Sequence, residues 1–386
     1  MKPKPKYNHS DLVHFIKDLY GRKKIIALHE PYLKGNEKKY ISKTIESSYV
    51  STVGEYVNKF ESKIANFVGS KYAIATSSGT SALHVSLILN NCSPNTEVIT
   101  QAISFVATCN AINYCGAKPI FIDVDLDTMS MSPTSLRQFL ENCAEVRDDG
   151  RCWNKITNNI ISVCLPMHTY GYLNRIDEIS KICKKYKLAV IEDAAESLGS
   201  FIGKKHSGTY GKMSSISFNG NKIITTGGGG AIITNNNLLA KKAKHISTTA
   251  KISHKWNFIH DEVGFNYRMP NINAALGLAQ LEQLDILLKK KKKLFRQYKN
   301  FFNKTHYSFF EGSSETSPNY WLNILLAKDK SDRDEILKIL HLNNILARPV
   351  WEPLNKLSMY KNSFAYNLIN TQKLADRIVC LPSSAI

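Results

Sequence analysis

The sequence predicts an α/β protein with a large, mostly parallel sheet domain and a smaller α+β domain at its C-terminal end. The chain has 386 residues, of which 43% are hydrophobic, so it can bury a large core and most naturally forms two domains. Between about residues 72 and 234, short apolar strand-like segments alternate with amphipathic helical segments. Such alternation is typical of a parallel sheet covered by helices on both faces. Near residue 270 this pattern ends and a long helical segment begins.

The segments before the alternation are predicted to be helical. A polar, basic lead-in contains one short helix, and two further segments carry apolar residues at helical spacing. These three helices are expected at 11–20, 37–47 and 55–68.

The alternating region contains short strands rich in Ile, Val and Ala, and each is followed by a turn or a helical pattern. We expect strands at 72–76, 97–100, 119–124, 160–165, 189–193 and 231–234, and helices at 82–89, 105–114 and 176–186.

The region after residue 270 is predicted to contain one long helix, from about 273 to 302, followed by a mixed region with a second helix at 333–340. We therefore divide the chain into three parts. They are an N-terminal arm at 1–28, a large α/β domain at 29–270 and a small α+β domain at 271–386.

The charge is strongly basic, with 51 Lys and Arg against 32 Asp and Glu, a formal net charge of +19. Such an excess can attract nucleic acid, an anionic membrane or a phosphorylated small molecule. The sequence has no long stretch in which Arg alternates with aromatic residues, so we expect no nucleic-acid partner. The densest run, Lys289 to Lys293, continues a helical pattern and is interpreted as a solvated helix face.

The eight cysteines form no Cys-x-x-Cys pair, and several fall within apolar patterns. We interpret them as reduced, buried residues, which predicts neither a disulfide framework nor a metal site. No stretch approaches the roughly 20 apolar residues of a membrane span, and the N-terminus lacks a signal-peptide core. We therefore expect a cytoplasmic protein without a membrane partner.

A turn of small residues, Ser77-Ser78-Gly79-Thr80, lies between the first strand and the following helix. The start of a helix offers free N–H groups and the positive end of the helix dipole to an anion, typically a phosphate. An ordinary helix cap explains the same residues equally well. No nucleotide P-loop and no Gly-x-Gly-x-x-Gly fingerprint accompanies this strand.

Acidic residues end the strand at 189–193, where the sequence reads Glu192-Asp-Ala-Ala-Glu196. A carboxylate at this place can pair with a cationic ring nitrogen, and the alanines leave room for a flat ring. The alternative is a carboxylate that caps the next helix.

A third segment, 215–230, places Lys222 among small and hydroxylated residues and ends in four glycines, Gly227 to Gly230. A lone amine in a cramped, largely uncharged segment is suited to forming a Schiff base with a carbonyl group. The alternative is a surface lysine beside a flexible glycine loop.

The order of these three sites along the chain favours pyridoxal phosphate as the cofactor. The Ser-Gly-Thr turn would hold the phosphate, and Lys222 would hold the aldehyde as an imine. Asp193 would keep the pyridine nitrogen protonated, so that the ring can act as an electron sink.

Six motifs in this order resemble those of the DegT/DnrJ/EryC1/StrS group of sugar aminotransferases, which share the fold type I architecture of aspartate aminotransferase. The resemblance runs from about residue 25 to the C-terminus. The motifs are Ser77-Ser-Gly-Thr-Ser-Ala-Leu-His84, Phe105-Val-Ala-Thr, Glu192-Asp-Ala-Ala-Glu-Ser-Leu-Gly199, Ser217-Phe-Asn-Gly-Asn-Lys222, Gly264-Phe-Asn-Tyr-Arg-Met-Pro270 and Arg348-Pro-Val-Trp351.

The resemblance implies a role for each site residue. Lys222 is expected to be the Schiff-base lysine and the proton shuttle, and Asp193 to pair with the pyridine nitrogen. Glu196 would neighbour the ring hydroxyl, and Phe105 would stack on the ring. The residues expected at the phosphate are Gly79, Thr80 and Ser217, with Asn266 reaching the phosphate of the neighbouring subunit in a homodimer with shared active sites.

Two positions depart from the pattern of many relatives: Gly228 replaces a Glu, and Glu196 replaces a Gln. Both variants occur among relatives that act at C4 of a sugar. The group also contains dehydratases with His at the lysine position, so Lys222 favours transamination.

Two further residues are weaker candidates for substrate contact. His168 follows a strand and could face the sugar, although a structural histidine at a strand end is the alternative. Trp351 could line the substrate pocket or could belong to the core of the C-terminal domain.

The resemblance implies an enzyme that moves an amino group from L-glutamate to a nucleotide-linked keto sugar, in amino-sugar and polysaccharide biosynthesis. Its closeness to 4-aminotransferases of legionaminic-acid-type pathways favours UDP-2-acetamido-2,6-dideoxy-hexos-4-ulose as the acceptor. The alternatives are a pyridoxal-phosphate-dependent sugar dehydratase or amino-acid lyase, a 3-aminotransferase on a dTDP- or GDP-linked keto sugar, and a non-enzymatic anion or nucleic-acid binder. The sequence leaves the nucleotide, the sugar and the configuration of the new amine open.

Overall fold

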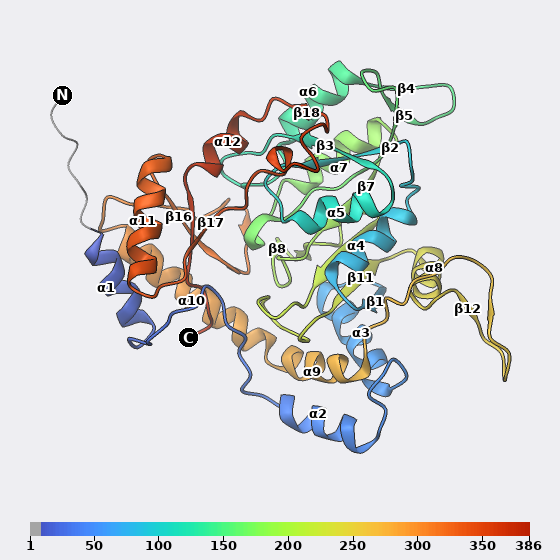
Figure 1. Cartoon of the computed structure of the whole chain (residues 1–386), viewed down its shortest axis with the longest axis horizontal. Coiled ribbons are helices and arrows are strands. Elements are labelled where there is room, and N and C mark those ends of the chain that lie inside the picture. The colour runs from blue at the N-terminus through green and yellow to red at the C-terminus, as the bar shows by residue number, and fades with distance from the viewer. Residues whose placement is uncertain (1–8) are drawn as a thin grey trace.

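The computed structural model describes residues 9–386 and is built around one large sheet (Figure 1). Neighbouring strands from β10 to β18 pair in parallel, which confirms the predicted α/β class with a mostly parallel sheet. Along the sheet the strands are β1 (Tyr72–Thr76), β11 (Gly230–Thr234), β10 (Met213–Ser217), β7 (Ala189–Asp193), β6 (Ile160–Cys164), β2 (Thr96–Gln101), β3 (Lys118–Ile122) and β18 (Ala365–Tyr366).

One strand of this sheet, β11, runs against its two neighbours. Because β1 and β10 are both antiparallel to β11, their carboxyl ends lie at the edge where β11 begins. Gly230 there faces Thr76 of β1 on one side and Ser217 of β10 on the other. The glycine run before β11, the turn after β1 and the end of β10 therefore meet at one edge.

Helices cover both faces of the sheet, as the alternation of side chains along a strand requires. In β1, Ala73 and Ala75 face a core shared with α3, whereas Ile74 faces α4 and α8. The helices that flank the sheet are α3 (Glu55–Val68), α4 (Gly79–Ile88), α5 (Val106–Tyr114), α6 (Pro133–Cys143), α7 (Ile176–Lys185) and α8 (Asn237–Ser247). Of these, α6 and α8 were not predicted from the sequence.

The predicted long helix over 273–302 is wrong as one element, because it is two helices that meet at Gln283. The first, α9 (Asn271–Glu282), packs against α2 (Glu37–Glu46) and α3. The second, α10 (Leu284–Phe302), continues into a different core, which its later residues share with α1 (Ser10–Leu19). Two cores in different directions require a change of axis between the helices.

The C-terminal part forms an antiparallel sheet that packs against α1, α10 and α11 (Lys330–Leu342). These helices gather at the end of the molecule where the C-terminus lies (Figure 1). In order, the strands are β14 (Ser308–Phe309), β16 (Asn323–Leu326), β19 (Ile378–Leu381) and β17 (Arg348–Pro349). Since α1 shares this core and β18 joins the large sheet, the three-part division of the chain remains a proposal.

The remaining elements are short, and the sequence did not predict them. The β12–β13 hairpin projects from the end of the molecule opposite α1 (Figure 1). These elements are β4 (Ala144–Val146), β5 (Cys152–Asn154), β8 (Phe201–Ile202), β9 (Lys205–His206), β12 (Lys251–Ile252), β13 (Ile259–His260), β15 (Thr316–Ser317), α12 (Ile369–Ala375) and the 3-10 turns η1 (Thr169–Gly171) and η2 (Leu354–Lys356).

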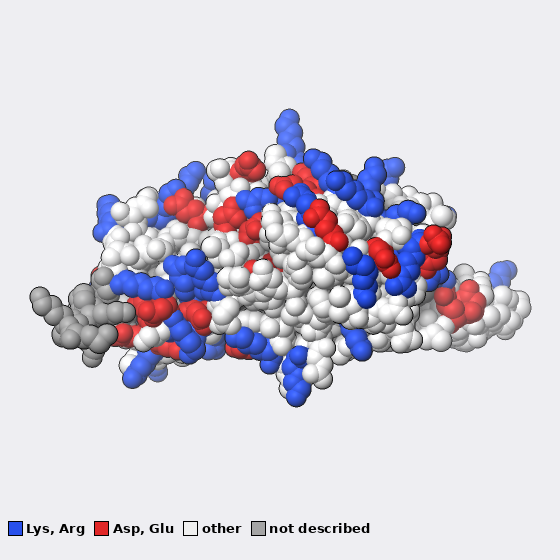
Figure 2. All heavy atoms as spheres, turned by 90° about the horizontal axis from the view of Figure 1, so that it is seen from above, with Lys and Arg blue, Asp and Glu red and all other residues white. Residues whose placement is uncertain are grey.

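Lys and Arg side chains lie interspersed with Asp and Glu over the face shown in Figure 2. The lysine run of α10 is mostly solvated, as predicted, but the prediction is wrong for Lys291, which is buried. Lys291 lies on the buried face of α10, one helical turn from Leu287 and from Leu294. All eight cysteines are buried, as predicted. Within residues 9–386, no helix combines the length and the apolar character needed to cross a membrane.

The glycine run at the start of β11 yields a prediction about stability. A Cβ atom on Gly230 would lie 2.5 Å from the backbone N of Gly79 and the backbone C of Ser78, whereas one on Gly228 would meet nothing within 4 Å. Gly230→Ala should therefore destabilise the protein by about 1–3 kcal/mol through overpacking. The matched control Gly228→Ala should change stability by less than about 0.5 kcal/mol. Urea unfolding of both variants tests this, and equal stabilities would contradict the close backbone approach.

Candidate active site

A cavity of about 350 Å³ opens at the edge where β1, β10 and β7 end and β11 begins. It is walled by loops that are distant in sequence, which the parallel sheet brings to one edge. Eight residues singled out in the sequence line it: Gly79, Thr80, Phe105, Asp193, Glu196, Ser217, Lys222 and Trp351.

One end of the cavity is the start of α4. Ser78 caps this helix by accepting a hydrogen bond from the Ser81 N–H at 3.0 Å. The N–H groups of a first helical turn have no acceptor within the helix, so those of Gly79 and Thr80 are available to an anion. A Cβ atom on Gly79 would lie 2.9 Å from Ser217 Cβ, so the turn can approach β10 only because residue 79 is glycine. This end suits a phosphate.

Asp193, the last residue of β7, also lines the cavity and is buried. Its Oδ2 accepts a hydrogen bond from the Thr108 hydroxyl at 2.7 Å, and its Oδ1 accepts one from the Ala195 N–H at 3.2 Å. Burial raises the pKa of Asp193, and the Thr108 hydrogen bond opposes that shift. No Lys or Arg forms an ion pair with Asp193 among residues 9–386, so a cationic ring nitrogen in the cavity would supply the missing countercharge.

Lys222 lines the cavity as well, and its amine has a charged neighbour. Its Nζ is 3.0 Å from Glu196 Oε1, and it lies 3.9 Å from the centre of the Trp321 ring. Glu196 Oε2 accepts a hydrogen bond from the Tyr170 N–H at 2.8 Å. Burial raises the pKa of Glu196, while the charge of Lys222 lowers it. The interpretation of Lys222 as a lone amine in an uncharged segment is therefore wrong, because its charged partner comes from another loop.

Aromatic side chains form the wall near the mouth of the cavity. Phe105 is 50% exposed and precedes the first turn of α5, with its ring centroid 6.1 Å from that of Trp351. The Trp351 ring in turn lies 4.8 Å from Tyr170. Both Phe105 and Trp351 line the cavity, so a flat ring or a sugar could lie against them.

Two residues named from the sequence do not line this cavity. His168 is fully buried, and its Nε2 lies 3.0 Å from Glu192 Oε2, which also accepts the Gly208 N–H. It therefore occupies a structural position behind β7. Asn266 is exposed and pairs with Thr248 in an isolated bridge, away from the cavity of its own chain. Its expected contact with a neighbouring subunit remains a proposal.

Three contributors to the site were not identified from the sequence: Thr108, Trp321 and the backbone of Tyr170. Thr108 is the last residue of the motif that begins at Phe105. It lies one helical turn further along the chain, and this spacing could have indicated that both side chains face the same site. Trp321 belongs to the C-terminal part of the chain, and no local sequence pattern indicates that this part contributes to the cavity. Tyr170 has a left-handed backbone, with φ +58°, which sequence periodicity does not reveal.

The arrangement fits pyridoxal phosphate. A phosphate cradle of backbone N–H groups, a buried carboxylate without a cationic partner and a lysine amine all face one cavity. The acidic side chains that line the cavity are those of Asp193 and Glu196, and neither belongs to the α4 turn. The fold and the site together thus define an enzyme that uses pyridoxal phosphate on a fold type I architecture.

Comparison with known proteins agrees with this class. A model of the DegT/DnrJ/EryC1/StrS aminotransferase family matches residues 31–385. EpsN of Bacillus subtilis (strain 168) is 37% identical over 367 residues, which is 94% of this chain and 92% of EpsN. GDP-perosamine synthase of Escherichia coli O157:H7 is 36% identical over 360 residues, 93% of each chain. The structure of Helicobacter pylori PseC, an aminotransferase involved in the biosynthesis of pseudoaminic acid, superposes with a TM-score of 0.83 at 25% identity, covering 93% of this chain and 94% of PseC.

The chain belongs to the DegT/DnrJ/EryC1/StrS aminotransferase family. The predicted family, the fold type I architecture, aminotransferase activity and pyridoxal phosphate as cofactor are thereby confirmed.

The buried carboxylate of Asp193 yields a prediction that separates stability from cofactor binding. Because burial raises its pKa in the folded protein, the ionised form costs the apoprotein stability, increasingly as pH rises above about 4. Asp193→Asn should therefore make the apoprotein more stable at pH 8, by a margin that shrinks toward pH 4. The same substitution should weaken binding of pyridoxal phosphate by roughly 30-fold or more, because the ring nitrogen loses its countercharge.

Thermal unfolding of both apoproteins across this pH range and a cofactor titration measure the two effects. A variant that is less stable at every pH, with unchanged cofactor affinity, would contradict the assignment of Asp193.

Proposed function

We propose that this enzyme transfers the amino group of L-glutamate to a nucleotide-linked 4-keto-6-deoxy sugar. The observation that carries the proposal is that Lys222 lines the same cavity as the phosphate turn and Asp193, with its amine 3.0 Å from Glu196. Pyridoxal phosphate, when bound, carries the amino group between the two substrates and withdraws electrons from the reacting carbon.

In this proposal Lys222 binds the cofactor and then moves a proton. When Lys222 is free, its amine can remove a proton from the glutamate carbon and return one to the sugar carbon, as a general acid and base. Glu196, 3.0 Å away, keeps the amine in the cavity. Asp193 is placed to stabilise a protonated ring nitrogen, and Phe105 and Trp351 offer aromatic faces against which a flat ring or a sugar can lie.

The acceptor sugar is inferred from the cavity and from relatives. A volume of about 350 Å³ falls within the usual range of small-molecule sites, and aromatic walls at its mouth suit a sugar ring. The sequence favours a UDP-linked 2-acetamido-2,6-dideoxy-4-keto sugar. A GDP-linked sugar is the second candidate, since three relatives at 33–36% identity are named GDP-perosamine synthase. Another relative, 29% identical, is named dTDP-4-amino-4,6-dideoxy-D-glucose transaminase.

We further infer that two copies of the chain complete each other's sites. The β12–β13 hairpin carries large apolar side chains that are open to solvent in one chain, with Trp256 73% and Phe258 81% exposed. Asn266 lies near the base of this hairpin and is exposed as well. A second subunit over this surface would cover the apolar residues and bring Asn266 toward its phosphate site.

The first test of the proposal uses glutamate alone. The purified holoenzyme should lose the visible absorption of bound pyridoxal phosphate and release one equivalent of 2-oxoglutarate per site. Lys222→Ala should slow this half-reaction by on the order of 10²- to 10⁴-fold, because it removes the proton-transferring amine. The control Lys289→Ala alters an exposed lysine of α10 and should react at the wild-type rate. A wild-type enzyme that releases no 2-oxoglutarate would overturn the proposal.

The second test identifies the acceptor. The glutamate-treated enzyme is offered UDP-, GDP- and dTDP-linked 4-keto-6-deoxy sugars and a 3-keto isomer, and the products are analysed by mass spectrometry and NMR. We expect a 4-amino sugar from the UDP-linked substrate. Loss of a hydroxyl without gain of nitrogen would indicate a dehydratase, and amination of only the 3-keto isomer would refute C4 specificity.

A further inference from the structure

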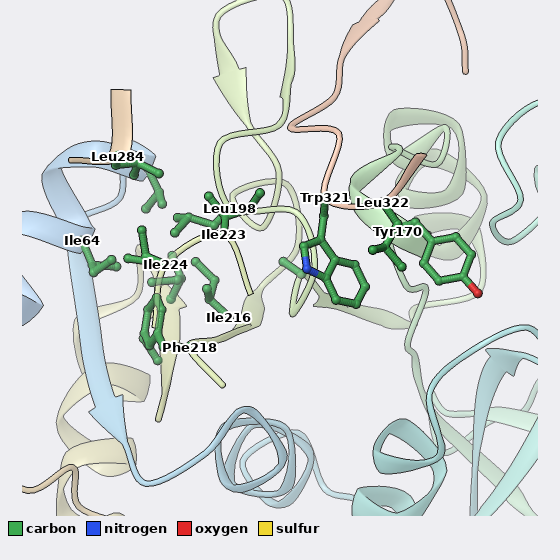
Figure 3. Close-up of a cluster of buried hydrophobic side chains, with 14 of the residues drawn as sticks. Ile64, Tyr170, Leu198, Ile216, Phe218, Ile223, Ile224, Leu284, Trp321 and Leu322 are labelled. Atoms are coloured by element: carbon green, nitrogen blue, oxygen red, sulfur yellow. The ribbon is translucent and has the colours of Figure 1, made fainter. Parts of the chain in front are cut away.

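Besides its ion pair with Glu196, the amine of Lys222 has a second contact, the ring of Trp321. Its ring centre is 3.9 Å from Lys222 Nζ, and its side chain is almost fully buried. Figure 3 shows the indole beside Tyr170 and between the side chains of Ile216 and Leu322. At this distance the negative face of a desolvated indole attracts an ammonium group.

Three hydrogen bonds fix Trp321 in place, one made by its indole and two by its backbone. Its Nε1–H donates to the carbonyl of Asn221, the residue before Lys222, at 2.7 Å. Its backbone carbonyl accepts a hydrogen bond from the buried Lys291 Nζ at 2.7 Å. Its backbone N–H donates to the Asn319 side-chain oxygen at 2.8 Å. The ring therefore has little freedom to move away from Lys222.

The same Asn319 side chain links Trp321 to the acidic partner of Lys222. Its Nδ2 donates to the backbone carbonyls of Glu196, at 2.8 Å, and of Leu198, at 2.9 Å. The two groups that contact Lys222 Nζ, the Glu196 carboxylate and the Trp321 ring, are thus tied to each other through one amide. A group that served only to fill the core would need no such connection.

We propose that Trp321 is a positioning residue, which holds the free ammonium group of Lys222 against Glu196 whenever this amine is not bound to the cofactor. The inference rests on the proposed role of Lys222 as the reactive amine. Trp321 and Glu196 together favour the charged amine in one fixed place, from which it can deliver a proton to the cavity. Through Lys291 of α10, this placement depends on the C-terminal part of the chain.

Other ionisable groups near Lys222 are Asp193, Glu196 and His29. The His29 ring lies behind the indole, with centroids 6.5 Å apart. Burial lowers the pKa of His29 well below its usual value, so this side chain stays neutral in the alkaline range where an amine titrates.

The test measures Lys222 in the apoprotein, without catalysis. Reductive methylation with formaldehyde and cyanoborohydride at one fixed pH, followed by peptide mass spectrometry, gives the rate at which Lys222 is labelled. Trp321→Leu should raise this rate by roughly 3- to 30-fold, since the amine loses its cation–π partner. Trp321→Phe, which keeps an aromatic ring of weaker attraction, should raise it by less.

The matched control is Trp153→Leu, because Trp153 also lies under a cation, with the Arg147 guanidinium carbon 4.4 Å from its ring centre on β5, away from the site. This variant should leave the labelling rate of Lys222 unchanged. In the holoenzyme, Trp321→Phe should lower kcat more than it raises the KM for glutamate.

An unchanged labelling rate of Lys222 in Trp321→Phe and Trp321→Leu would overturn the inference. Trp321→Phe keeps most of the buried bulk, so it decides the question if the Leu variant fails to fold. The proposed function fails separately, if the wild-type enzyme releases no 2-oxoglutarate from glutamate.

Discussion

The close approach of Gly230 to the Ser78–Gly79 backbone is the constraint on which the site depends. Strand β11 separates β1 from β10 and is antiparallel to both, so its first residue lies between the ends of its neighbours. Only a residue without a side chain fits there, since a Cβ atom would lie 2.5 Å from the neighbouring backbone. This contact sets the distance between the α4 turn and the end of β10, and so between the phosphate cradle and the loop that carries Lys222.

The site built on this contact destabilises the folded protein when no cofactor is bound. Asp193 and Glu196 are both buried carboxylates, and burial raises the pKa of each. Glu196 is compensated by Lys222 and by the Tyr170 N–H, whereas Asp193 has only neutral donors in Thr108 and Ala195. The cavity is therefore complementary to a ligand with a positive charge near Asp193 and an anionic group at the α4 turn. The pyridine nitrogen and the phosphate of pyridoxal phosphate supply this pair of charges.

Much of the fold and of the site could be predicted from the sequence, because strands and helices of the large sheet have clear local periods. Helix 55–68 has the predicted bounds, and Asp193 ends β7 while Lys222 follows β10, the parallel neighbour of β7. What could not be predicted depends on contacts across the chain. The ion pair of Lys222 with Glu196, the burial of Lys291 and the return of Trp321 to the cavity each join segments that no local pattern connects. The split of the 273–302 helix at Gln283 likewise reflects two cores rather than a helix-breaking residue.

The central claim is that the cofactor is attached to Lys222 in the cavity at this sheet edge. Reduction of the holoenzyme with borohydride, followed by proteolysis and mass spectrometry, locates the attachment directly, because it makes the bond between lysine and cofactor permanent. We predict a single phosphopyridoxyl group, on the peptide that contains Lys222. A group attached to another lysine, or a holoenzyme that yields no labelled peptide, would contradict the account.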